Sequence, residues 1–150
     1  MTDNSESQHG FPWEDRYLLG HNGMDDVHRE FVELVDRLLT VDDAGLPDAL
    51  TAFAEHAVAH FDQENRWMDT DGFPARDCHV DEHNKVLESV REVQQELAAG
   101  NVTIVRDLAR ALMDWFPGHA DYMDSALATW LVKRSHGGRP LVFRRNSSTE

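Results

Sequence analysis

Apolar residues recur every three or four positions through most of this chain, which is the period of an amphipathic helix. Four segments have this period, at about residues 24–39, 47–70, 74–99 and 102–133. In the first segment, the apolar stripe consists of Val27, Phe31, Leu34, Val35 and Leu38. Strand patterns are weak throughout the chain. The pattern therefore predicts an all-α protein with four long helices.

The breaks between these segments are short and rich in turn-forming residues. The sequences Asp-Asp-Ala-Gly, Asp-Gly-Phe-Pro and Gly-Asn separate the four predicted helices. Short connections favour antiparallel packing of successive helices, so we expect an up-down-up-down antiparallel four-helix bundle. We assign residues 1–134 to this bundle, including a non-helical N-terminal arm whose residues 1–12 we expect to be loose. Residues 135–150 are assigned to a C-terminal tail.

The composition of the chain indicates which partners it does not bind and in which compartment it is found. The 150 residues suit one domain with a real core. A net charge of −14 argues against binding to nucleic acid or to an anionic membrane surface. A single cysteine, Cys78, forbids an internal disulfide and is typical of a reducing compartment. With neither a signal-peptide pattern nor a long apolar run, the chain is expected to be cytoplasmic and compatible with a monomer.

Seven residues on the predicted helices have nitrogen or oxygen atoms that could bind metal. They fall into four groups: His28; His60 with Glu64; His79 with His83; and His119 with Asp124. Side chains four residues apart lie on one face of a helix, and a bundle can bring such faces together. Five imidazoles and two carboxylates exceed the needs of one tetrahedral zinc. They suit two first-row metals that the carboxylates bridge.

The spacing of His119 and Asp124 does not fit a regular helix. Five residues correspond to about 500°, which leaves Asp124 roughly 140° around the helix from His119. A π-type turn would bring the two side chains together, and Pro117 makes an irregular helix plausible at this point. Asp121 is the structural alternative, although a spacing of two residues fits no better.

The same residues carry a resemblance to a known family. The matching segments are Asp25-Asp26-Val27-His28, His60-Phe61-Asp62-Gln63-Glu64 with Met68, His79-x-x-x-His83, and Trp115-Phe116-Pro117-Gly118-His119 followed by Asp124. Over about residues 13–133 the chain resembles the bacterial hemerythrins, which are non-haem di-iron oxygen-binding proteins. The family's use of His-x-x-x-x-Asp favours Asp124 as the seventh ligand.

The resemblance implies a cofactor of two iron ions in an asymmetric, oxo- or hydroxo-bridged site. One iron would be held by His79, His83 and His119, and the other by His28 and His60. Glu64 and Asp124 would bridge the two. Dioxygen would bind reversibly as a hydroperoxide at the two-histidine iron, for oxygen carriage, storage or sensing.

Apolar residues at helical offsets from the ligands are candidates for the walls of an oxygen pocket. Phe116 is the first choice, followed by Trp115, Phe31 and Val32, although an ordinary core role is favoured for most of them. Leucine is common in the family where Phe116 stands, and a larger aliphatic residue where Ala120 stands. Both departures would alter the size of the pocket and leave the ligands unchanged.

The same sequence leaves one alternative function and two further residues to consider. A di-iron oxidase, a peroxidase or a nitric oxide-handling enzyme is the alternative, but the oxidases use Glu-x-x-His motifs that this chain has only at Glu6–His9. Reversible binding, and not catalysis, is therefore expected. His56 could assist the site or relay protons, or it could be hydrogen-bonded or exposed. Cys78 is expected to be a spectator.

Overall fold

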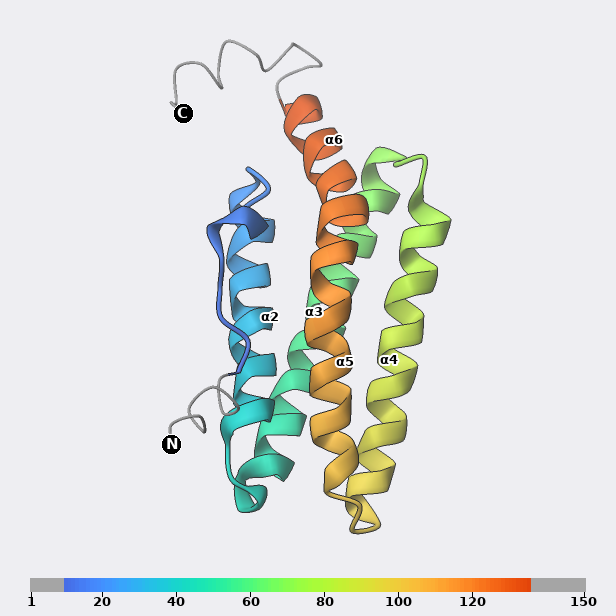
Figure 1. Cartoon of the computed structure of the whole chain (residues 1–150). Helices are drawn as coiled ribbons and strands as arrows, with labels where there is room; N and C mark the ends of the chain where they lie inside the picture. The colour runs from blue at the N-terminus through green and yellow to red at the C-terminus, as the bar shows by residue number, and fades with distance from the viewer. Residues whose placement is uncertain (1–9, 136–150) are drawn as a thin grey trace.

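The computed structural model describes residues 10–135, and it is an antiparallel four-helix bundle (Figure 1). The elements are η1 (Asp15–Tyr17), α2 (Asn22–Thr40), η2 (Asp43–Gly45), α3 (Leu46–Asp71), α4 (Arg76–Ala98), α5 (Thr103–His119), η3 (Ala120–Asp124) and α6 (Ser125–Ser135). Among these residues there is no strand. Helix α2 packs against α3 and α5, and α4 packs against the same two helices. The predicted all-α bundle is confirmed.

The helix ends follow from local sequence. His21 precedes α2, and its Nδ1 accepts a hydrogen bond from the backbone N–H of Met24, which would otherwise be unpaired in the first turn. Pro47 stands in the first turn of α3, where its missing N–H costs nothing. Gly72 ends α3 with φ of 66°, a left-handed conformation that favours glycine. The predicted helix bounds agree with the structure to within about two residues.

The fourth predicted helix is a continuous rod made of α5, η3 and α6 (Figure 1). Its middle part, η3, is a π-helix of five residues that begins directly after His119. Pro117 lies inside α5 just before this change. The irregularity predicted from the spacing of His119 and Asp124 is therefore present.

Two apolar clusters fill the bundle, with a polar layer between them. The larger cluster includes Phe31, Phe53, Phe61, Leu112 and Phe116, and the smaller one includes Met24, Met68, Phe73, Leu127 and Leu131. The buried polar residues belong to α2, α3, α4, α5 and η3, and most of them are histidines. Burial of so many ionisable groups is costly unless they are paired or bind metal. The bundle therefore concentrates its chemistry in one buried layer.

From Gly10 onward, the N-terminal arm is extended apart from the 3₁₀ turn η1, and it runs along α2 (Figure 1). The expectation of a loose arm over residues 1–12 is wrong for Phe11, which is only 4% exposed. The backbone N–H of Phe11 donates to Asp36 Oδ1 at 2.9 Å, and that of Leu19 donates to Asp25 Oδ1 at 2.7 Å. Apolar burial and these two bonds hold the arm on the bundle.

Several sequence-based predictions fall outside the described residues. The Glu6–His9 motif, residues 1–9 of the arm and residues 136–150 of the predicted tail belong to this group. Within the part of the chain that the structure describes, none of the helices is both long and apolar enough to cross a membrane.

Candidate metal centre

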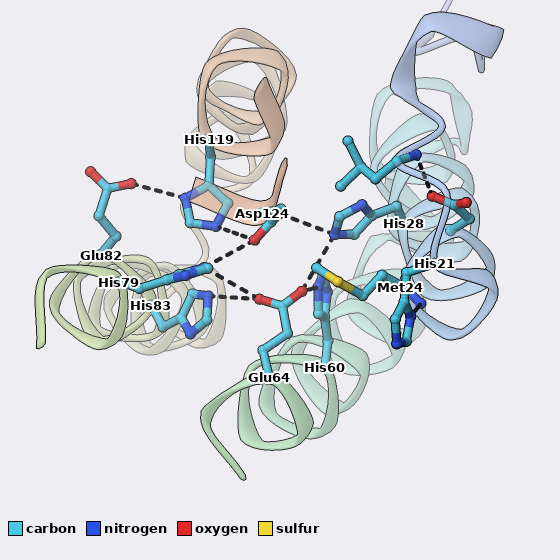
Figure 2. A network of polar contacts seen from close by, with 12 residues as sticks. His21, Met24, His28, His60, Glu64, His79, Glu82, His83, His119 and Asp124 are labelled. Carbon is cyan, nitrogen blue, oxygen red and sulfur yellow. Dashed lines mark hydrogen bonds and ion pairs between the residues drawn. The ribbon is translucent and has the colours of Figure 1, made fainter. Parts of the chain in front are cut away.

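All seven residues singled out as ligand candidates meet in the polar layer, from four sides of the bundle (Figure 2). Helix α2 contributes His28; α3 contributes His60 and Glu64; α4 contributes His79 and His83; α5 and η3 contribute His119 and Asp124. Each is buried, with at most 6% of its surface exposed. The structure therefore brings together every member of the set, and it leaves Asp121 exposed outside it.

Glu64 lies between two groups of histidines and turns one oxygen to each (Figure 2). Its Oε2 is 2.8 Å from Nε2 of His60 and 3.4 Å from Nε2 of His28. Its Oε1 is 3.0 Å from Nε2 of His83 and 3.5 Å from Nε2 of His79. A carboxylate with this geometry can bridge two cations.

Asp124 divides its oxygens between the same two groups. Its Oδ1 is 2.9 Å from Nε2 of His79 and 3.1 Å from Nε2 of His119, and its Oδ2 is 3.0 Å from Nε2 of His28. This geometry depends on η3, because the wider π-turn returns Asp124 to the side of the helix that carries His119.

The donor set fits metal ions better than it fits hydrogen bonds among its own members. Nε2 of His83, Nε2 of His119 and Oε1 of Glu64 are buried without a hydrogen-bond partner among residues 10–135, although other ligand atoms lie near them. Two groups of ligand atoms are close enough to hold a cation each, and Glu64 belongs to both. They are Glu64, His79, His83, His119 and Asp124, and His28, His60 and Glu64. Two cations would satisfy the unpaired atoms.

The electrostatics also favour positive charge at the centre. Burial lowers the pKa of His28, but its hydrogen bonds to Asp124 and Glu64 outweigh burial and raise that pKa to about 10. The same balance raises the pKa of His79 to about 9. Burial raises the pKa of Glu64, yet His60, His28 and His79 hold it well below its usual value. Burial and the charge of Glu64 raise the pKa of Asp124, but His119 and His28 outweigh them and hold it well below its usual value. Both carboxylates thus stay ionised, with protons on imidazoles where metal ions would otherwise bind.

Two residues that contact the candidate ligands were not predicted from the sequence. Asn65 Oδ1 is 2.9 Å from Nδ1 of His83, and Glu82 Oε1 is 3.1 Å from Nδ1 of His119. Burial raises the pKa of Glu82, but the hydrogen bonds from His119 and Trp115 outweigh it and lower that pKa overall. The only signal in the sequence was position, because each follows a ligand at a spacing of one or three residues.

Three of the four residues considered for an oxygen pocket lie against histidines of the centre, but on different sides. The Phe116 ring meets that of His28 edge-on at 5.3 Å, and the Phe31 ring meets that of His60 edge-on at 5.9 Å. Trp115 instead stacks on His119 at 4.3 Å. Val32 is buried within the larger apolar cluster. Phe31 and Phe116 thus face the two-histidine group, and Trp115 faces the three-histidine group.

Two other predictions concern residues near the centre. The side chain of His56 is 8% exposed, its Nδ1 lies 3.3 Å from Oε1 of Glu30, and its ring lies 5.2 Å from that of His60. Burial, and to a smaller extent His60 and His28, lower its pKa to about 4, so it is neutral at pH 7. Cys78 is exposed and is not part of either ligand group.

Comparison with known proteins shows which family the chain belongs to. The model of one family, described as the hemerythrin HHE cation binding domain, matches residues 19–131. The chain belongs to the hemerythrin family. A relative named bacteriohemerythrin, from Ralstonia nicotianae, is 36% identical over 85% of this chain and 93% of its own length. Another bacteriohemerythrin, from Methylococcus capsulatus, is 26% identical over 67% of this chain and 79% of its own length.

Solved hemerythrin structures share the fold. A wild-type hemerythrin superposes with a TM-score of 0.72 at 23% sequence identity, covering 79% of this chain and 95% of that chain. A hemerythrin mutant gives a TM-score of 0.70 at 23% identity, covering 78% and 96%. At such identities the match supports the four-helix architecture alone.

Proposed function

We propose that this chain binds dioxygen reversibly at a pair of non-haem iron ions, for oxygen carriage, storage or sensing. The observation that carries the proposal is that Glu64 and Asp124 each direct one oxygen to His79 and its neighbours and the other to His28. Two buried carboxylates shared in this way suit two cations held side by side. Family membership and the names of the relatives support iron and dioxygen as the metal and the ligand.

The proposed ligand sets are unequal. His79, His83 and His119 would hold one iron, and His28 and His60 the other, while Glu64 and Asp124 serve both. The second iron would have one imidazole fewer, so an external ligand would bind on that side. Two ferrous ions, when bound, would supply the two electrons that take dioxygen to the peroxide level, and would recover them on release. Neutral imidazoles suit ferrous iron and carboxylates suit ferric iron, which matches a site that alternates between the two.

The surrounding residues would keep this chemistry reversible by excluding water. Phe31 and Phe116 cover the two-histidine group, and both are at most 1% exposed. Met24 and Met68 are equally buried, and they cover the buried polar layer on the side of the smaller apolar cluster. An apolar shell limits access of solvent and protons to the metal site. His56, which is neutral at pH 7, adds no acidic proton beside His60.

A di-iron oxidase, a peroxidase or a nitric oxide-handling enzyme is the alternative. The ligand set favours binding, because five imidazoles accompany only two carboxylates, whereas the di-iron oxidases are rich in carboxylates. The proposal also includes a cytoplasmic location, since the exposed thiol of Cys78 suits a reducing compartment.

The test is anaerobic loading with ferrous iron, followed by iron counting and absorption spectra through cycles of oxygen and vacuum. We expect two irons per chain and a visible band that appears with oxygen and disappears without it. Irreversible oxidation, or continued consumption of an added reductant, would favour the enzyme. Failure to retain stoichiometric iron would refute the proposal.

One ligand variant and one control make this test specific. His83→Ala should lose the iron on the three-histidine side and with it reversible oxygen binding. His21→Asn removes a histidine outside the centre and retains a good N-cap for α2, so it should bind two irons normally. Normal iron and oxygen binding by His83→Ala would mean that the ligand assignment is wrong.

A further inference from the structure

Glu82, on α4, contacts two residues of α5 through one oxygen atom (Figure 2 shows the contact with His119). Its Oε1 is 3.1 Å from Nδ1 of His119, and Trp115 Nε1–H donates to the same oxygen at 3.2 Å. The Trp115 ring also stacks on the His119 ring, with centroids 4.3 Å apart and planes inclined by 25°. The imidazole of His119 is thus held at one edge and on one face.

This contact distinguishes His119 from the other histidines of the centre. Nδ1 of His28, His60 and His79 is buried without a hydrogen-bond partner among the described residues. Nδ1 of His83 meets a neutral partner, the amide oxygen of Asn65. Among these five histidines, His119 is the one whose Nδ1 the structure pairs with a carboxylate outside the centre. A carboxylate partner makes the opposite nitrogen of an imidazole a stronger ligand.

Glu82 also stands between the centre and solvent. A surface cavity of about 280 Å³ is lined by Glu82, Trp115, Gly118, His119, Tyr122 and Met123. The side chain of Glu82 is 36% exposed, whereas that of His119 is 2% exposed. Without the carboxylate, water in this cavity would compete for Nδ1 of His119, and the ring could turn.

We propose that Glu82 is a positioning residue for the cation on the three-histidine side. It accepts Nδ1–H of His119, which leaves Nε2 of that ring, 3.1 Å from Oδ1 of Asp124, free to bind a cation. It also strengthens that nitrogen as a ligand. Trp115 completes the arrangement by orienting the carboxylate and covering the ring. This role rests on the proposed two-cation centre and adds to it a residue that touches neither cation.

The experiment uses zinc alone as a diamagnetic probe of the full chain. Glu82→Ala removes the charge and the acceptor, Glu82→Gln removes the charge and retains an acceptor, and Asp81→Asn removes a charge from an exposed neighbour on the same helix. Zinc stoichiometry and affinity are measured against a chelator. Long-range ¹H–¹⁵N spectra of the zinc-loaded proteins report whether Nδ1–H of His119 is present and protected from exchange.

We expect Glu82→Ala to weaken one of the two zinc sites by about 10–100-fold and to lose the protected Nδ1–H signal. Glu82→Gln should keep the signal and bind zinc with intermediate affinity, and Asp81→Asn should match the wild type. Wild-type affinity and a protected signal in Glu82→Ala would overturn the inference. If that variant does not fold, wild-type zinc affinity in Glu82→Gln overturns it instead. A wild-type chain that binds no zinc through His119 overturns this inference, whereas the proposed function is overturned by failure of the iron loading described above.

Discussion

Phe31 of α2 and Phe116 of α5 stack on each other, with ring centroids 5.1 Å apart and planes inclined by 22°. Their edges meet the rings of His60 and His28, so one aromatic pair covers the two-histidine side of the centre. Tyr17 of the N-terminal arm packs edge-on against Phe116 at 5.2 Å from the other direction. The arm therefore supports a wall of the proposed metal site.

Replacing Phe116 with alanine should open this wall. We expect the metal-free protein to lose about 3–5 kcal/mol of stability, as for other buried phenylalanines, and the iron-loaded protein to oxidise irreversibly faster because water reaches it. Phe116→Leu should change both quantities less, since it leaves less empty space. Urea unfolding and the decay of the visible band in air measure the two effects.

Phe53→Ala is the matched control for Phe116→Ala. Phe53 is fully buried and packs on Phe31 at 5.5 Å, so its loss should cost similar stability. Its loss should alter the oxidation rate less, because Phe31 and Phe116 still cover the histidines. Equal oxidation rates in the two variants would show that Phe116 has no special part in excluding water.

Cation binding should strengthen as pH rises. The pKa values of His28 and His79 are raised to about 10 and about 9, so both imidazoles carry protons at pH 7 that a cation must displace. Zinc titration in weak buffer at pH 7 should release protons, and the apparent affinity should fall on going to pH 6. Zinc affinity that does not vary with pH would contradict this assignment.

The folding stability of the metal-free protein should fall as pH rises, which is opposite to the change expected for cation affinity. A raised pKa in the folded state stabilises folding fully below the unfolded value of 6.5, and this contribution is lost as pH rises through about 9 and 10. Urea unfolding at pH 6.5 and at pH 10 should therefore show lower stability at the higher pH. Zinc-loaded protein is the control, since its imidazoles carry no such protons.

Deletion of Tyr122 tests the role of the π-turn. Tyr122 is 80% exposed, and its removal would leave four residues from His119 to the aspartate, which a regular α-helix places on one face. We expect the deletion variant to keep two zinc ions. Insertion of one alanine after Tyr122 should abolish zinc bridging, because it rotates Asp124 away by about 100°. If the deletion variant loses zinc, this explanation of the turn is refuted.

Local pattern in the sequence was enough to locate the four helices, because a 3.6-residue apolar period and glycine- or proline-rich breaks are local properties. The pairs His60 with Glu64 and His79 with His83 follow in the same way, since a four-residue spacing puts two side chains on one helix face. His119 and Asp124 mark the limit of this reasoning. Their spacing required an irregular turn, which resemblance to the hemerythrins supported and the structure contains.

Contacts between segments far apart in the chain were decided only by the tertiary structure. The burial of Phe11 against Phe116 depends on the N-terminal arm packing along α2, and the apolar periodicity of the sequence does not predict that contact. Glu82 is one of 28 acidic residues, and only the packing of α4 against α5 sets it apart by placing it beside His119. Sequence periodicity determines which face of each helix turns inward. The packing of the helices determines which inward atoms meet at distances of about 3 Å, where hydrogen bonds and metal binding occur.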